Sequence, residues 1–290
     1  MATAPMRAPG TEPAAQPSGC MQVLLAPFAT LGEIILFWTV TFLGLMEFLG
    51  DVLIVIGKSL GFMLRGAISW RLTVAQMAFL GVDSMGIILI CVGFTGMTMA
   101  SALMDQVARY GVGKDLVGGG ILYVMCKELA PVLTGLILAG RAGAGMASEI
   151  GSMKVTEQID ALRATGVHPI RYLSVPRILA NLLMCPLLTF AAAVVGVVAG
   201  YVSAHYFSPV GLSFTTYFNS VENFWHFELL RTLIKKSLVF GLIVSAVAVT
   251  EGFNAQGSAA AVGRATTRAV VNAMVLIFLV DMLMTIVFDV

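Results

Sequence analysis

The stretch ILANLLMCPLLTFAAAVVGVVAGYVSA, residues 178–204, decides the fold class because it contains no charged residue. A helix needs about 20 predominantly apolar residues to cross a bilayer, and this segment exceeds that length. The whole chain of 290 residues has the same character, with 58% hydrophobic residues, 11% charged residues and a mean hydropathy of +0.93. A soluble domain carries about 25% charged residues. The composition therefore excludes a water-soluble enzyme.

Four further apolar stretches bring the expected number of transmembrane helices to five. They cover roughly residues 82–104, 121–140, 237–250 with its flanks, and 269–288. The stretch at 237–250 is shorter than a bilayer requires unless residues 229–237 continue the same helix. The three His and four Cys residues are too few and too scattered for a metal site or a disulfide framework, and we expect no cofactor in this chain. The expected fold class is an all-α membrane protein.

Two segments precede the first of these helices. Residues 1–20 are rich in proline, alanine and glycine, so we expect a disordered tail. Residues 21–70 are mostly apolar, but the part at 23–64 carries four charges, at Glu33, Glu47, Asp51 and Lys58. An Asp or Lys near the bilayer centre costs about 2.5–3.5 kcal/mol, so we expect an amphipathic helix that lies in the membrane interface. The alternative is one true span followed by an amphipathic piece. Residues 71–290 then form the transmembrane domain.

The distribution of positive charges predicts a cytoplasmic N-terminus. With five alternating spans, this orientation places eleven Lys and Arg residues on the cytoplasmic side and five on the other side. Short cytoplasmic loops carry an excess of such residues. Aromatic residues within 205–228 fit a belt at the opposite membrane surface. The formal net charge of +1 gives no basic field that would indicate a nucleic-acid partner.

The segment between the second and third spans, Gly140–Arg177, carries most of the functional information. Apolar residues recur at i, i+3 within residues 147–165, namely Ile150, Met153, Ile159 and Leu162. Charged residues occupy other positions, and Gly166 can end a helix in the left-handed conformation. We therefore expect a short amphipathic helix over about 147–165. It is either a solvated connector or a helix that docks into a groove of a partner protein.

Two of the apolar stretches contain charges. Lys127 and Glu128 lie in the second stretch, just before Pro131, and Asp281 lies in the middle of the last one. An unpaired charge inside a membrane is costly, so each of these residues is a functional hypothesis. Lys127 and Glu128 could instead fix the helix register or mark a helix end near water. Asp281 is expected to face another helix or a cavity, or to be protonated.

The residues KELAPVLTGLILAGRAGAGMASEIGSMKVTEQIDALRATGVHPIRYLSVPRILA, 127–180, closely resemble the signature region of the MlaE/YrbE permease family, and RATTRAVVNAMV, 264–275, resembles a second family block. The resemblance implies an interfacial helix, five spans, a cytoplasmic coupling helix between the second and third, and a homodimer that encloses a lipid cavity. It implies the permease subunit of an ABC transporter that moves phospholipid between membranes with an Mce-domain partner. A separate ATPase subunit would bind ATP and Mg and dock on the coupling helix.

The resemblance also implies roles for individual residues. The ATPase would couple to the charged residues of the helix at 147–165, which are Glu149, Lys154, Glu157, Asp160 and Arg163. An intramembrane polar pair would join Glu128, beside Lys127, to Lys236, with Lys235 as the substitute. Lipid-binding residues on the first and last spans would include Met97, Met104, Phe278 and Arg264, although Arg264 could simply anchor a helix end. His168 departs from the acidic or Asn residue that the family usually has before Pro169.

Motifs of catalysis are missing from the sequence. The GKS triplet at residues 57–59 lacks the first P-loop glycine, because position 52 is Val52. We therefore expect a transport subunit rather than an enzyme. Two alternatives are a secondary transporter, for which no convincing internal repeat is present, and a non-transporting membrane scaffold. The expected membrane is a bacterial inner membrane, with the plastid inner envelope as the alternative.

Overall fold

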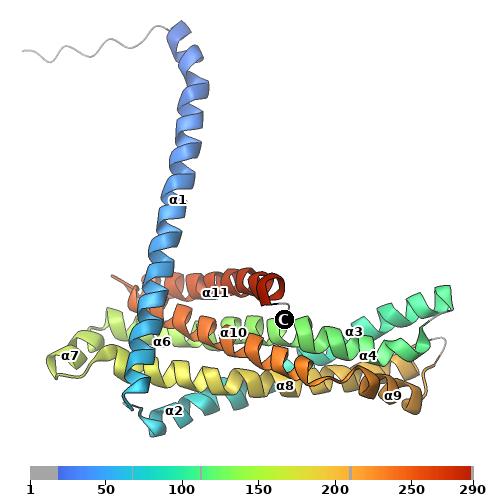
Figure 1. Ribbon diagram of the computed structural model, residues 1–290. Helices are drawn as coiled ribbons and strands as arrows, with labels where there is room; N and C mark the ends of the chain where they lie inside the picture. Colours follow the sequence, from blue (N-terminus) through green and yellow to red (C-terminus); the bar gives the residue numbers. More distant parts are fainter. Residues whose placement is uncertain (1–18, 67, 112, 209–210, 289–290) are drawn as a thin grey trace, which may run out of the picture. The chain divides into compact units, whose positions relative to one another are not determined.

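The computed structural model describes residues 19–66, 68–111, 113–208 and 211–288, and within these ranges it contains helices and no strands (Figure 1). The expected all-α class is therefore confirmed. The predicted disordered tail, residues 1–20, lies outside the described residues apart from its last two positions.

The chain divides into two units, Met1–Gly50 and Asp51–Val290. Helix α1 (Gly19–Leu64) begins in the first unit and ends in the second. It is one continuous helix, so the region expected to be helical over 21–70 is helical as far as Leu64. Its position in the membrane interface stays a prediction.

Five helical segments of the second unit are long and apolar enough to cross a membrane, which is the expected number. They are Trp70–Tyr110, Lys114–Val155, Ile170–Tyr206, Phe227–Phe253 and Ala259–Val287. The fourth does include residues 229–237, as its required length predicted. These segments contain the helices α2 (Trp70–Met77), α3 (Asp83–Tyr110), α4 (Val117–Val124), α5 (Ala130–Leu138), α6 (Ala144–Val155), α8 (Val175–Tyr206), α10 (Phe227–Phe253) and α11 (Ala259–Phe288).

Short helices close the bundle at its two ends (Figure 1). Helix α7 (Gln158–Ala164) lies between the second and third spans, and α9 (Phe214–Phe224) lies between the third and fourth. We call these ends the α7 end and the α9 end. Helix α9 begins at Ser213, whose hydroxyl accepts a hydrogen bond from the Thr216 amide at 3.2 Å and so satisfies a free N–H group of the first turn.

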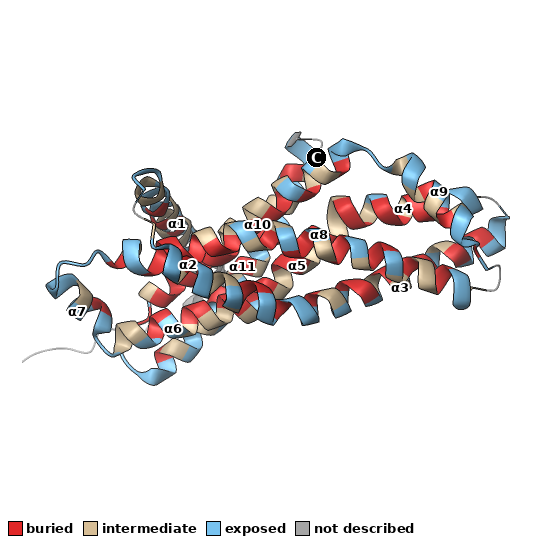
Figure 2. Cartoon of the chain, turned by 90° about the horizontal axis from the view of Figure 1, so that it is seen from below, coloured by how far each residue is buried: buried red, intermediate tan, exposed pale blue. Residues whose placement is uncertain are grey.

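Close helix contacts depend on glycine. A Cβ atom added to Gly96 on α3 would collide with the backbone carbonyl of Gly196 on α8. One added to Gly200 would lie 3.0 Å from the hydroxyl of Tyr217. Gly196 and Gly200, which have the GxxxG spacing, therefore lie at a close helix–helix contact of the kind that small residues permit in membranes. Figure 2 shows the buried residues on the inward faces of α3, α4, α5 and α8.

π-helical turns interrupt the first two spans at Ala78–Val82, Met125–Leu129 and Ala139–Gly143, and a fourth, Ile170–Ser174, begins the third span. The turn at Met125–Leu129 has a cause in the sequence, because Pro131 has no N–H to donate to the carbonyl four residues before it. The Ala130 amide bonds instead to the Met125 carbonyl, five residues back. Such turns are frequent at functional sites, and this one contains Lys127 and Glu128.

The prediction of a single helix over 147–165 is wrong. Helix α6 carries the second span on to Val155, and the glycine-rich segment at 140–145 is part of this helical span rather than a loop. The chain then turns at Thr156 and Glu157, and α7 follows. Glu157 has φ of 60°, in the left-handed region, so the α-helix cannot continue through it. Periodicity did not reveal this break because Glu157 is not a typical residue for that conformation.

Candidate functional site

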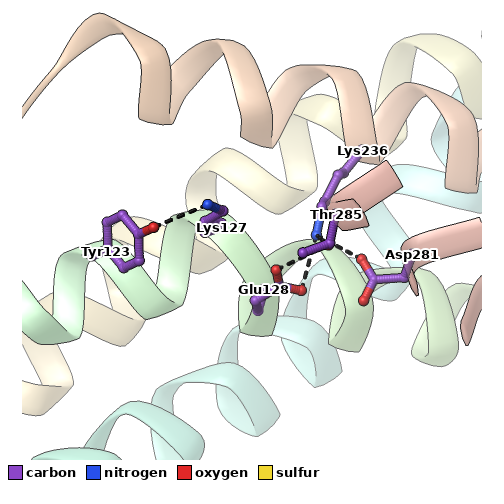
Figure 3. A network of polar contacts seen from close by, with 6 residues as sticks. All are labelled: Tyr123, Lys127, Glu128, Lys236, Asp281 and Thr285. Carbon is purple, nitrogen blue, oxygen red and sulfur yellow. Dashed lines mark hydrogen bonds and ion pairs between the residues drawn. The ribbon is translucent and has the colours of Figure 1, made fainter. Parts of the chain in front are cut away.

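A buried ammonium group joins three helices in the interior of the bundle (Figure 3). The Nζ atom of Lys236 on α10 lies 2.9 Å from a carboxylate oxygen of Glu128 and 2.8 Å from one of Asp281 on α11. It also donates to the hydroxyl of Thr285 at 3.0 Å, and that hydroxyl donates to the second oxygen of Glu128 at 3.3 Å. The four side chains form one connected polar network.

The helices place these groups by simple spacing. Asp281 and Thr285 are four residues apart on α11, so they share one face of that helix. Glu128 lies in the π-helical turn of the second span, and Lys236 lies in the third turn of α10. Figure 3 shows the side chains of Glu128, Asp281 and Thr285 pointing toward the Lys236 amine.

The partners of Lys236 balance its charge and occupy its hydrogen-bond donors. The Lys236 side chain is completely buried, while Asp281 is 16% and Glu128 is 36% exposed. Two carboxylates and a hydroxyl together satisfy all three N–H groups of the ammonium. Removing one partner from a buried ion pair leaves an uncompensated charge and costs about 3–5 kcal/mol. The network is therefore a constraint that ties α10 and α11 to the second span.

The predicted site contained part of this network. The structure has the expected contact between Glu128 and Lys236, and Lys235 forms no ion pair within the described residues. Lys127 points away, with its amine 3.0 Å from the Tyr123 hydroxyl one turn earlier on the same helix. Thr285 was not predicted, and its only signal was its position one turn after the isolated Asp281.

The corner between α6 and α7 has an apolar inner side and a charged outer side. Ile150 and Ile159 are completely buried in a cluster with Leu173, Ile178 and Val249, against which Met153 and Leu162 also pack. The apolar residues of the predicted amphipathic helix therefore cover the core of this chain. Ile150 and Ile159 are not available to fill a partner's groove, which corrects the docking interpretation for these two residues.

The charged residues proposed for ATPase coupling form two separate groups. Asp160 accepts hydrogen bonds from Lys154 at 3.2 Å and from Arg163 at 3.0 Å. These three side chains form one group near the surface of the corner. Glu149 belongs elsewhere, because it pairs at 2.7 Å with Arg177, whose side chain is almost fully buried. Glu157 is exposed at the start of α7. All three acids are exposed, but Glu149 is paired with a buried arginine of α8, so the acids that α7 itself presents are Glu157 and Asp160.

The four residues predicted to bind lipid do not form one site. Met104 is completely buried by its own chain, so it cannot line an open cavity, and that prediction is corrected. Met97 on α3 is half-buried and Phe278 on α11 is 56% exposed. Arg264 is exposed near the start of α11, where it borders a shallow hollow with Thr267. It is fourteen residues from Phe278, or roughly 21 Å along the helix.

Known proteins resemble this chain over most of its length. Residues 73–287 match the family described as Permease MlaE. A "Probable ABC transporter permease protein" of Synechocystis sp. is 40% identical over 216 residues, which cover 74% of this chain and 81% of that protein. Protein TRIGALACTOSYLDIACYLGLYCEROL 1, chloroplastic, of Arabidopsis thaliana is 34% identical over 236 residues, or 81% of this chain and 66% of that protein.

A third relative is the intermembrane phospholipid transport system permease protein MlaE of Haemophilus influenzae. It is 33% identical over 239 residues, which cover 78% of this chain and 88% of that protein. The family match extends through all five candidate spans. The resemblance noted in residues 127–180 is thereby confirmed, and the chain belongs to the MlaE family of membrane permeases.

Proposed function

We propose that this chain is the permease subunit of an ABC transporter that moves phospholipid between membranes, powered by a separate ATPase subunit that binds ATP and Mg. The observation that carries the proposal is the family match across all five candidate spans. The names of the Synechocystis and Haemophilus relatives, an ABC permease and a phospholipid permease, support the transporter class and the cargo. The same match argues against a secondary transporter or a non-transporting scaffold.

The ATPase docks at the α7 end, which we place in the cytoplasm together with the N-terminus. The apolar contacts of Ile159 hold α7 against the bundle. A movement of α7 on ATP binding or hydrolysis would therefore move α6 and α8 as well. Glu157 and Asp160 face outward and offer the acidic contacts for the ATPase. Lys154 and Arg163 fix the Asp160 side chain, while Glu149 holds α6 to α8 through Arg177.

Two copies of the chain form the transporter, with an Mce-domain protein on the α9 side. Helix α11 packs on its own chain along one face and leaves an apolar row exposed, consisting of Val271, Val275, Phe278 and Met282. A second copy or the lipid cavity between the copies would cover this row. Met97 and Phe278 remain candidates for the cavity wall, because both are accessible.

The polar network around Lys236 closes one end of the lipid pathway. It ties three helices together at one level, so a movement of α11 must either carry the network with it or break it. The network therefore couples movement of the last span to the rest of the bundle, because α11 can move alone only if these contacts break. The bacterial inner membrane is the proposed location, with the plastid inner envelope as the alternative that the chloroplastic relative supports.

Charge reversal at the α7 corner tests the proposal. The full chain, expressed with its native neighbours, should bring down an ATPase subunit during purification. The double variant Glu157→Lys/Asp160→Lys should lose that ATPase and ATP-driven phospholipid transfer between vesicles. The matched control, Asp115→Lys/Glu228→Lys, reverses two exposed acids toward the α9 end and should keep both. The proposal is wrong if the chain purifies with no ATPase, or if both double variants behave alike.

A further inference from the structure

A groove at the α7 end has no role so far, although Lys154 and Arg163 of the α7 corner are among the residues that line it. It has a volume of about 610 Å³ and lies between the C-terminal part of α1, helix α7, the segment 166–170 and the end of α10. A neighbouring hollow of about 340 Å³ shares Lys58 and His168 with it and extends along α1 to Arg65. Volumes in this range accept small-molecule ligands. All the residues that line it lie within the unit Asp51–Val290.

Basic side chains dominate the rim of this groove. Lys58 and Arg65 contribute from α1, Lys154 from α6 and Arg163 from α7, whereas Asp51 is the acidic residue of the lining. Asp51 is engaged by the amide of Asn254 at 3.1 Å. Lys154 and Arg163 share one carboxylate, that of Asp160. No ion pair involves Lys58 or Arg65 among the residues that the structure describes. The groove therefore has an excess of positive charge without a protein partner.

The shape of α1 keeps the groove open. Lys58 and Arg65 are seven residues apart and therefore lie on the same face of the helix, two turns from each other. Gly57 and Gly61 lie beside them, and a Cβ atom built at either glycine meets nothing within 4 Å. His168 is held over the same hollow by its ring contact with Phe62, with 4.9 Å between the ring centroids.

Apolar surface accompanies these charges. Val55 and Ile159 form part of the lining, where both are buried. On α1, Ile54 lines the groove and Phe62 lines the neighbouring hollow, each four residues from Lys58 and so on its face of the helix, and Ile54 is 52% exposed. Cations beside these apolar side chains suit a ligand that has both an anionic group and hydrocarbon. An acidic surface of a protein would satisfy only the cations.

We propose that this groove binds the headgroup of an anionic phospholipid of the surrounding leaflet, as a resident lipid distinct from the transported cargo. Basic pockets at the membrane surface bind such headgroups. The phosphodiester lies against Lys58 and Arg65, and the acyl chains follow Ile54 and Phe62 on the same face of α1. Because the groove also includes Arg163, the bound lipid bridges α1 and α7 and steadies the corner at which the ATPase docks. The inference needs only a membrane-embedded chain and can fail without affecting the proposed transport function.

Lipid binding to the purified full chain tests the proposal. Native mass spectrometry in detergent measures the affinity for dioleoylphosphatidylglycerol and for zwitterionic dioleoylphosphatidylcholine. A Lys or Arg near an anionic lipid contributes about fivefold in affinity, so the double variant Lys58→Ala/Arg65→Ala should bind phosphatidylglycerol about thirtyfold more weakly. The control Arg109→Ala/Lys114→Ala removes two exposed cations at the α9 end and should bind as the unmodified chain does. Gly61→Leu places a side chain in the hollow, where a Cβ atom at this position meets nothing within 4 Å, and it should weaken the same binding without loss of charge.

Three results would overturn the proposal. One is equal affinity of the Lys58→Ala/Arg65→Ala variant and its control for phosphatidylglycerol. Another is displacement of phosphatidylglycerol by inorganic phosphate, which would identify a site for free phosphate rather than lipid. The third is a Lys58→Ala/Arg65→Ala variant that keeps phosphatidylglycerol but loses the ATPase, because the cations would then serve a protein partner.

Discussion

Replacing Lys236 by methionine should destabilise the bundle more than any other single change to the polar network. Lys236→Met keeps a side chain of similar length but leaves Glu128 and Asp281 side by side with no cation between them. Breaking a buried ion pair costs about 3–5 kcal/mol. Since Glu128 is 36% exposed and Asp281 is 16% exposed, we take the lower end, about 3 kcal/mol. At about 2 °C per kcal/mol for a chain of this size, the Tm should fall by about 6 °C.

The assay is thermal unfolding of the purified chain in detergent, followed by intrinsic fluorescence. The matched control is Lys235→Met, the same substitution one residue earlier on α10, where no ion pair is lost. A partly exposed site without partners changes stability by about 0.5 kcal/mol or less, so the control Tm should move by about 1 °C. Asp281→Asn leaves Lys236 paired with Glu128 and should fall between the two.

A triple variant gives a second test of the charge network. The triple variant Glu128→Gln/Lys236→Met/Asp281→Asn removes every charge at once, so it should recover most of the stability that Lys236→Met loses. Equal Tm values for Lys236→Met and Lys235→Met would refute the idea that a charge network holds these helices. A triple variant less stable than Lys236→Met would refute the charge-balance explanation.

Three other changes give independent tests. Glu157→Gly relieves the left-handed conformation before α7 and should raise the Tm by about 2 °C, as about 1 kcal/mol of backbone strain predicts; an unchanged or lower Tm would contradict this. Gly96→Leu collides with the Gly196 carbonyl and should prevent accumulation of the folded chain, whereas Gly86→Leu, on the same helix with open space around it, should be tolerated; equal yields would contradict the contact. Val275→Cys on the exposed face of α11 should form a disulfide-linked dimer under oxidation, and an exclusively monomeric product on a denaturing gel would count against the homodimer.

Hydrophobicity and length were sufficient to predict the fold class and the number of spans. The cost of placing charge in hydrocarbon leaves few alternatives for a stretch such as 178–204. The ends of the helices were less predictable. Lys114–Val155 extends well beyond the apolar stretch at 121–140, because its polar end carries Glu149, which pairs with Arg177 of the next span. A hydropathy pattern cannot register a pairing that forms only in the folded chain.

A charged residue inside an apolar stretch could be identified from the sequence as a candidate site residue. The residue that it pairs with could not, because the pairing depends on how the helices pack. Glu128 and Asp281 stood out for that reason, but neither spacing nor composition showed that one lysine serves both. Lys127 stood out equally and lies outside the network, because successive residues of a helix point about 100° apart. Thr285 carries no charge and gave no signal of its own.

The α7 corner shows what amphipathicity can and cannot determine. The repeat of Ile150, Met153, Ile159 and Leu162 indicates that one side must be covered, and it does not indicate by what. In this chain the cover is the core formed with Leu173, Ile178 and Val249. The apolar contacts therefore hold the corner in place, and only its charged outer side is free to recognise another subunit. Recognition by charge is sensitive to ionic strength, whereas the apolar contacts are not. An ATPase that dissociates from the purified complex at high salt, with the Tm of the permease unchanged, is the behaviour that this division of roles requires.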